Sequence, residues 1–349
     1  MSFLKLSFQI SILFSVFAVA SIHLPVYGQE PHSPALNDRD VGISLYRQGN
    51  TQSGIKALSD AVKKDKLDVD AWYYLGQACN ATGDSKCARK SLEEVVKLRP
   101  DYPEARASLA YALLRLKKMK EAVAEAERAL AMRPGQELAH HVIGTVRLHQ
   151  KSYLAATEQA DAALKLTPTY PPALLLKSQA LFGLYLDEIS VQVYVEDKQI
   201  ADAITKRRVA YLADAGAALE QYIQLQPNDK DIMAWQEQLE SIRAYAKEPI
   251  PTAQVFLGAD VTTKVVVKGK PEPLYTEQAR GNCVTGTVIL RAIFTAHGTV
   301  ANVRVIRGLP DGLTEMAVAA AWKIKFLPAT KNGRPVSMYV QLEYNFNLY

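Results

Sequence analysis

The sequence is poor in the residues on which most metal and catalytic sites depend. It holds 6 histidines and 3 cysteines in 349 residues. His140 and His141 are adjacent, so they point in different directions on a helix and cannot bind one metal ion as an i, i+4 pair. No phosphate-binding glycine loop, G-x-S-x-G motif or pair of carboxylates in a glycine-marked cleft occurs. We therefore predict no catalytic residue, no cofactor and no metal site, and an enzyme is the least favoured class.

Three cysteines are too few to form a disulfide framework. Cys79 and Cys87 fall near the end of one predicted helix and the start of the next, where antiparallel helices approach to disulfide distance. Two interpretations stay open, a bridge between them or two buried thiols. Cys283 has no evident partner and no neighbouring histidine or carboxylate pattern typical of a nucleophile, so we expect a free, unreactive thiol.

Charge of one sign is not in large excess. The chain has 41 Lys and Arg against 36 Asp and Glu. Residues 261–349 hold 11 basic and 5 acidic residues, whereas the rest holds 30 and 31. The basic surplus therefore belongs to the last quarter, which indicates a second domain and is too dilute to predict nucleic-acid binding. At roughly 100 to 200 residues per domain, the length also predicts about two domains.

Long apolar runs are missing except at the start of the chain, and the mean hydropathy of -0.08 excludes a multi-pass membrane protein. No charged residue occurs between Lys5 and Glu30. Residues 1–28 are typical of a signal peptide, with small-residue cleavage sites after Ala20 or Gly28. A retained membrane anchor is the alternative, because about 20 apolar residues suffice to span a bilayer. Both predict that the rest lies outside the cytoplasm.

A repeat of fixed period fills the middle of the chain. Pro100, Pro134 and Pro168 are 34 residues apart, and the unit ending at Pro100 contains Trp72, then Leu75-Gly76 and Ala88 at signature spacing. This pattern resembles the tetratricopeptide repeat, a helix hairpin that stacks into a solenoid. The frame predicts an all-α solenoid over residues 35–247, with about five repeats.

The fifth unit starts at Pro171 and is longer than the others. Its closing Pro227 follows Pro168 by 59 residues, which is one period plus 25, and places an insertion at about 183–207. The insertion either lengthens both helices or forms a short strand at Val191–Val195, where apolar residues alternate. A last helix at 229–247 is predicted to cap the stack with a polar outer face.

A solenoid of this kind offers a concave groove lined by the first helix of each unit, which commonly holds a peptide. The candidate groove residues are mostly apolar or aromatic, so we expect an apolar peptide or the C-terminal part of the chain as the occupant. Packing between helices is the alternative role for any one of them. The candidates are Tyr46, Tyr73, Asn80, Tyr111, Leu114, His141, Leu148 and Phe182.

The last part of the chain changes character after a Pro- and Gly-rich segment. Residues 248–263 are predicted to be a linker. Two strands at 287–296 and 299–307, joined at His297-Gly298, precede a helix from Asp311 to Lys323, whose free N–H groups Asp311 can cap. Alternating apolar residues then predict a half-buried strand at 336–345.

Several ordered motifs in residues 264–349 resemble the C-terminal domain of TonB-family energy transducers. They are Pro271-Glu272-Pro273 with Tyr275, Gly286-Thr287-Val288, His297-Gly298, Trp322-x3-Phe326-x-Pro328, Gly333-x-Pro335-Val336 and the terminal Phe346. The resemblance implies a small α+β domain of β-β-α-β order with helices on one face. It also implies that the last strand is an exposed edge, to which a short segment of an outer-membrane receptor adds as a further strand.

The residues themselves are consistent with such an edge, because no helix or charge-rich segment follows the last strand to cover it. A strand edge that is capped or paired in a dimer is the alternative. The outward side chains that would meet the incoming segment are Ser337, Tyr339, Gln341, Glu343 and Asn345.

The favoured function is that of a TonB-like protein in the periplasm of a Gram-negative-type bacterium, soluble or anchored to the inner membrane. The resemblance implies that it binds a TonB-dependent outer-membrane receptor peptide in transmembrane transport. The repeats would recruit a further protein, with the inner-membrane proton-driven motor complex as one candidate. Energy transducers usually carry a Pro-rich spacer, which this chain lacks. The alternative is therefore a periplasmic scaffold or assembly adaptor that transmits no force.

Overall fold

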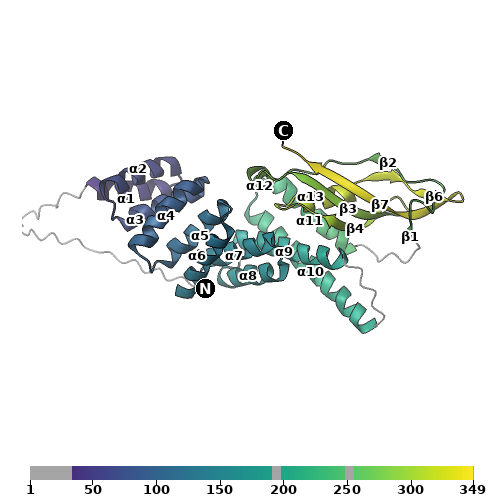
Figure 1. The fold of residues 1–349 in the computed structure, drawn as a ribbon, viewed down its shortest axis with the longest axis horizontal. Helices are drawn as coiled ribbons and strands as arrows, with labels where there is room; N and C mark the ends of the chain where they lie inside the picture. Colours follow the sequence, from purple (N-terminus) through teal and green to yellow (C-terminus); the bar gives the residue numbers. More distant parts are fainter. Residues whose placement is uncertain (1–33, 191–197, 248–254, 349) are drawn as a thin grey trace, which may run out of the picture.

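The structure is a computed structural model that describes residues 34–190, 198–247 and 255–348. Its first part, the repeat stack (residues 34–247), is a row of helix hairpins that runs from the purple end of the ribbon to the C-terminal sheet (Figure 1). The helices are α1 (Pro34–Arg47), α2 (Thr51–Lys64), α3 (Val69–Thr82), α4 (Ser85–Leu98), α5 (Pro103–Arg115), α6 (Met119–Met132), α7 (Glu137–His149), α8 (Tyr153–Leu166), α9 (Pro171–Ser190), α10 (Lys198–Leu225) and α11 (Ile232–Lys247).

Glycines at matching frame positions let paired helices approach closely. An ideal Cβ on Gly76 of α3 would lie 2.6 Å from the Leu92 Cγ of α4, and one on Gly144 of α7 would lie 2.5 Å from the Leu176 Cδ2 of α9. Real Cβ contacts are essentially never this short, so a larger residue would push the helices apart. These two glycine positions are therefore close-packing positions.

The insertion in the fifth unit lengthens its helices. α9 has 20 residues and α10 has 28, against 14 in α8. The alternative strand at Val191–Val195 falls on residues 191–197, outside the described residues.

The second part, the C-terminal domain (residues 255–348), is an α+β unit, as the sequence predicts. Its main sheet has the order β1-β7-β3-β4, with β6 paired to β7, while β2 and β5 form a separate two-stranded ribbon. The elements are β1 (Val255–Phe256), β2 (Val266–Gly269), α12 (Glu277–Gly281), β3 (Gly286–Phe294), β4 (Val300–Arg307), α13 (Leu313–Trp322), β5 (Lys325–Leu327), β6 (Ala329–Lys331) and β7 (Arg334–Phe346).

The register of the sheet follows the alternation seen in the sequence. β3 and β7 are antiparallel from Gly286 opposite Phe346 to Phe294 opposite Met338. Leu342, Tyr344 and Phe346 are buried on the face that α13 covers, while the intervening side chains face outward. The predicted β-β-α-β order is thus confirmed, with α13 on one face of the sheet.

Two local expectations differ from the structure. The range assigned to a linker, 248–263, includes β1, which pairs in parallel with Ser337 and Met338 of β7. Asp311 does not cap α13, because Gly312, in the left-handed conformation at φ 84°, stands at the N-cap position. The Asp311 carboxylate instead accepts a hydrogen bond of 2.7 Å from the side-chain amide of Asn282.

The repeat stack and the C-terminal domain share one continuous hydrophobic core. α11 packs on α13, and the rings of Tyr245 and Trp322 meet edge to face at 4.9 Å. The Tyr245 hydroxyl also donates to the Val303 carbonyl of β4 at 2.8 Å. The sequence predicts that α11 caps the stack with a polar outer face. That prediction is wrong, because the C-terminal domain packs on α11. This packing removes the side chains of Trp235 and Tyr245 from water, and the burial of their apolar surface stabilises the contact.

Titratable side chains line one side of this junction. The imidazole of His149, at the end of α7, has its Nε2 3.9 Å from a carboxylate oxygen of Asp311. Glu315, in the first turn of α13, is partly buried beside them. Burial, followed by the negative charge of Asp311, raises the pKa of the Glu315 carboxyl to about 7.

We predict that Glu315→Gln stabilises the protein at pH 8 but not at pH 4. The folded-state pKa lies above the ordinary 4.5 of the unfolded chain, so stability falls as pH rises from about 4.5 to about 7. The cost is about 2 kcal/mol, since each pKa unit corresponds to 1.36 kcal/mol and the group is partly exposed. Urea unfolding at both pH values measures this difference. The exposed Glu127→Gln of α6 is the control, and equal behaviour of the two variants would contradict the prediction.

Candidate functional site

The strand β7 changes its neighbours along its length. On one side it pairs with β3 from Met338 to Phe346. On the other side, β1 pairs with Ser337–Met338, while β6 pairs with Arg334–Val336 at the start of β7. From Tyr339 to Phe346 no described strand occupies this second side. We call this segment the open edge.

The opposite edge of the sheet, β4, is protected. Its ladder with β3 is irregular around Asn302, whose φ of 48° marks a bulge. The neighbouring Val303 carbonyl is occupied by the Tyr245 hydroxyl of α11. Bulges and covering elements are the usual means by which proteins block an edge. The open edge of β7 is thus the side of this sheet at which a further strand can pair.

One basic side chain reaches the open edge. The Lys270 ammonium donates to the main-chain carbonyl of Glu343 at 2.6 Å and lies 4.4 Å from the centre of the Tyr344 ring. This contact indicates that the Glu343 carbonyl faces the open side. Because the N–H and C=O of a residue point to the same side and alternate along a strand, Tyr339 and Gln341 present theirs to that side too.

The predicted outward row lies on the uncovered face of the sheet, and its side chains bond one another or β3. The Gln341 amide donates to the Glu343 carboxylate at 3.0 Å, and Asn345 accepts from the Thr287 hydroxyl at 2.7 Å. The guanidinium of Arg291 lies 5.0 Å from the centre of the Tyr339 ring. Ser337 differs from the others, because β1 covers its main chain and its hydroxyl accepts from the Ala296 N–H. Ser337 is therefore not part of the open edge.

The candidate groove residues on the first helices of the repeats fall into two groups. Tyr46, Tyr73, Asn80, Tyr111, His141 and Leu148 are partly exposed. Leu114 is buried, and Phe182 is fully buried in the shared core, where its ring stacks on Tyr185. Phe182 is a core residue rather than a groove residue, because Tyr245 of α11 packs against its ring and the C-terminal domain continues the same core.

Aromatic residues that the sequence analysis did not select join this surface. Tyr102 stacks on Tyr73 with ring centres 4.9 Å apart, and Tyr170 meets His141 edge to face. Tyr102 and Tyr170 each follow a repeat-closing proline by two residues, so the frame contained the signal. Burial, then the neighbouring Tyr73, raises the pKa of Tyr102 to about 12.

Two polar groups near this surface lack partners within the described part of the chain. The Asn80 side-chain amide donates to the Ser108 carbonyl at 3.2 Å, but its own carbonyl oxygen is buried and unpaired. Nδ1 of His141 is likewise buried and unpaired, and burial lowers the pKa of this imidazole to about 4. Both atoms lie in the protein interior, where an unpaired polar group costs about 1 to 3 kcal/mol.

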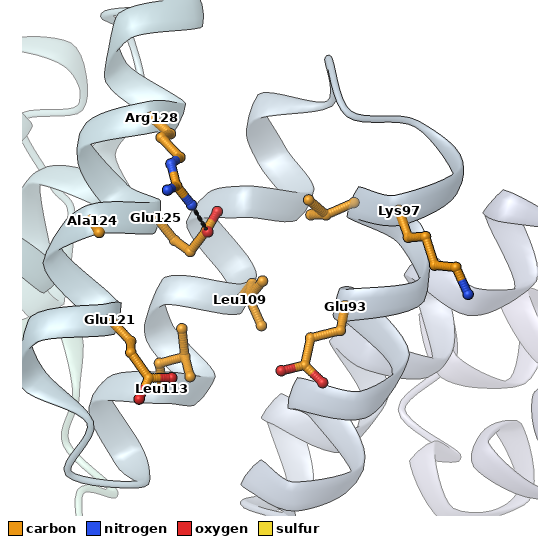
Figure 2. A pocket seen from close by; sticks show the side chains of 9 residues that line it. Glu93, Lys97, Leu109, Leu113, Glu121, Ala124, Glu125 and Arg128 are labelled. Atoms are coloured by element: carbon orange, nitrogen blue, oxygen red, sulfur yellow. Dashed lines mark hydrogen bonds and ion pairs between the residues drawn. The ribbon is translucent and has the colours of Figure 1, made fainter.

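The repeat stack also has an open crevice of about 420 Å³ between α4, α5 and α6 (Figure 2). Glu93, Glu121 and Glu125 lie at its walls, and Arg128 pairs with Glu125. Among residues 34–190, 198–247 and 255–348, no group of three metal-binding side chains converges here or elsewhere. The crevice is a gap between neighbouring hairpins with no chemical group set to react.

Family models match both parts of the chain. The model described as "Gram-negative bacterial TonB protein C-terminal" matches residues 271–348. The model described as "Tetratricopeptide repeat" matches residues 40–88 and 81–137. The chain combines tetratricopeptide repeats with a TonB C-terminal domain. Both families are protein-interaction domains, so the matches are consistent with a binding protein.

Individual proteins resemble the repeats rather than the whole chain. Tetratricopeptide repeat protein 13 of Homo sapiens is 28% identical over 170 residues, which are 47% of this chain and 19% of that protein. The structure of PilW, a type IV pilus biogenesis factor, is 17% identical with a TM-score of 0.46, covering 62% of this chain and 89% of that one. A thermophilic repeat protein of Thermus thermophilus is 17% identical with a TM-score of 0.44, covering 60% and 99%.

Membrane-spanning helices are absent from the part of the chain that the structure describes. None of the helices there combines the length and the apolar character needed to cross a bilayer.

A disulfide joins the first two cysteines in the repeat stack. Cys79 of α3 and Cys87 of α4 are bridged across the turn, with Cα atoms 5.8 Å apart. The backbone geometry of the turn favours this closeness, because Gly83 ends α3 and the Asp84 carboxylate caps α4 by accepting from the Cys87 N–H. Cys283 is free and exposed.

We predict that reducing this bridge destabilises the repeats by about 2 kcal/mol, because the cross-link closes a short loop of the unfolded chain. Denaturant unfolding with and without a phosphine reductant measures the difference. The variant Cys79→Ala/Cys87→Ala should not respond to the reductant, and Cys283→Ala should respond like the unaltered protein. A reductant effect that persists in the double variant would contradict a Cys79–Cys87 bridge.

Proposed function

We propose that the TonB C-terminal domain binds an extended segment of a TonB-dependent outer-membrane transporter by strand addition to the open edge, Tyr339–Phe346. The observation that supports this most is the difference between the two sheet edges: β4 is protected, whereas over this segment no described strand pairs with the side of β7 that faces away from β3. In strand addition, main-chain hydrogen bonds give affinity and alternate side chains give selectivity. The row Tyr339, Gln341, Glu343 and Asn345 would supply that selectivity.

The repeats would recruit a second protein through their concave groove. Tyr73 and Tyr102 form a stacked pair there, and aromatic side chains are the commonest anchors of peptide and protein interfaces. The inner-membrane motor complex is the partner that the resemblance to energy transducers implies.

The proposed location is the periplasm of a Gram-negative-type bacterium. The family matched by residues 271–348 supports an envelope protein. Residues 1–28 would act as a cleaved signal peptide or as an inner-membrane anchor.

The packing of the two domains favours a second candidate function. Trp235 and Tyr245 hold the C-terminal domain on the end of the repeat stack, and no Pro-rich rod separates them. A domain fixed in this way suits a periplasmic scaffold or assembly adaptor, which would hold a receptor segment close to a groove-bound partner without transmitting force.

Replacing Gln341 by proline is the sharpest test of the open edge. The substitution removes an N–H that faces the open side. The hydrogen bonds between β7 and β3 remain, because they are made by the residues on either side of Gln341. We expect the affinity for a synthetic transporter N-terminal peptide to fall at least roughly tenfold, measured by isothermal titration calorimetry.

Two variants accompany this measurement. Gln341→Ala keeps the N–H and should bind within about threefold of the unaltered protein. Leu342→Ala, on the buried face, should lower the free energy of unfolding by about 2 to 5 kcal/mol. It shows how much affinity is lost when the domain is destabilised but the N–H groups of the open edge are kept. Unchanged affinity of a folded Gln341→Pro protein would refute pairing at this edge.

N-terminal sequencing of the exported protein separates the two candidate functions. Energy transduction through this chain requires its own anchor, so a retained Met1 is the expected result for an energy transducer. A mature start at Ser21 or Gln29 would instead favour the scaffold.

A further inference from the structure

A dense basic surface lies at the end of the C-terminal domain, around β2 and β5. Segments 261–271 and 323–335 together hold seven Lys or Arg and no Asp or Glu. The fold brings them together, because Val266 pairs with Leu327 and Thr263 with Thr330. We call these two segments the basic ribbon. Its charge of +7 exceeds that of the whole chain, which is +5.

The basic ribbon has an inner and an outer face. Val265 packs against the core and Phe326 is buried, whereas the residues of the outer face are exposed; Val267, paired with Phe326, is also 45% exposed. The outer face carries aliphatic tips between lysines, with Val266 50% and Leu327 52% exposed. Its residues are Lys264, Val266, Lys268, Lys325 and Leu327.

Some of the seven cations have partners within the protein. Lys323 pairs with Glu237 and Glu240 of α11, Lys270 bonds the Glu343 carbonyl, and Lys331 lies over the Phe256 ring. The other four are exposed and form no ion pair within the described part of the chain. They are Lys264, Lys268, Lys325 and Arg334.

We propose that the basic ribbon docks on a lipid surface with anionic headgroups. Unpaired cations near such a surface are each attracted to it, and their attractions sum because the surface is continuous. The aliphatic tips of Val266 and Leu327 can enter the headgroup region while the lysine stems extend beside them. The ribbon is at the sheet end of the molecule, away from α1 to α4, so docking leaves the groove accessible (Figure 1).

The geometry favours a lipid surface over an acidic peptide. The two best-formed crevices lie on the repeat stack, so neither of them offers the ribbon a pocket for a side chain. Lysines, which act as point charges, suit mobile headgroups, whereas planar recognition of carboxylates usually relies on arginine. Three of the four unpaired cations are lysines, which matches the first kind of partner better than the second.

The test is co-sedimentation of the full chain with two kinds of vesicle. One kind is phosphatidylcholine alone and the other contains phosphatidylglycerol, so the ratio of the two partition coefficients isolates the electrostatic part from any binding by residues 1–28. We expect Lys268→Gln/Lys325→Gln to lower this ratio about 25-fold, or about fivefold per lysine. Added salt should lower the ratio of the unaltered protein.

The matched control is Lys86→Gln/Lys90→Gln, which removes the same charge from exposed positions on α4. It should lower the ratio less than about twofold, and thermal unfolding should show both variants folded. The proposal is overturned if the unaltered protein binds both vesicles equally or if the two variants behave alike. It is also overturned if a glutamate-rich peptide binds the ribbon while anionic vesicles do not. Transporter-peptide binding at β7 should persist in both variants, so this proposal can fail independently of the proposed function.

Discussion

The packing of α11 against α13 is the contact on which the rest of the molecule depends. Tyr245 takes part in it twice, since its ring meets Trp322 and its hydroxyl bonds the Val303 carbonyl. The same contact closes the apolar end of the repeat stack and supports the covered face of the sheet. Without it, both domains would expose aromatic surface, which costs roughly 25 cal/mol per Å².

This contact also fixes which edge of the sheet can bind. A small sheet has two edges, and each offers unpaired N–H and C=O groups to a further strand. Here α9 and α11 lie against β4, while on the second side of β7 the short strand β1 pairs only with Ser337 and Met338. The orientation of the domain on the stack therefore leaves one open edge. It also fixes the distance and direction of that edge from the groove.

The polar residues at the junction show that the contact is not purely apolar. Both side-chain polar atoms of Gln238, on α11, are buried without a partner in the described residues, as is Nε1 of Trp235. Glu315 adds a carboxylate whose ionised state is disfavoured by burial and then by the negative charge of Asp311, so that its pKa is raised. Buried unpaired polar groups cost about 1 to 3 kcal/mol each. The junction is thus less stable than its apolar area alone would suggest.

Periodic features were readable from the sequence because they depend on local spacing. The 34-residue interval of prolines predicted the helix hairpins, and alternation predicted β3, β4 and β7 within a few residues. Asp311 failed as a helix cap because Gly312 takes the left-handed conformation there, a detail of one dihedral angle that composition does not reveal. Val255 and Phe256 were missed as a strand, because two residues carry no period.

The sequence by itself determined the two domains, the repeat, the β-β-α-β order of the main elements along the C-terminal domain and the face to which each of those strands turns its side chains. Only the tertiary structure decided that Phe182 is core, that Ser337 is covered by β1 and that Lys270 reaches Glu343. It also decided that two basic segments more than 50 residues apart form one surface. Local spacing fixes how a segment folds, whereas burial, edge pairing and charge clustering depend on contacts between segments that are distant in the chain.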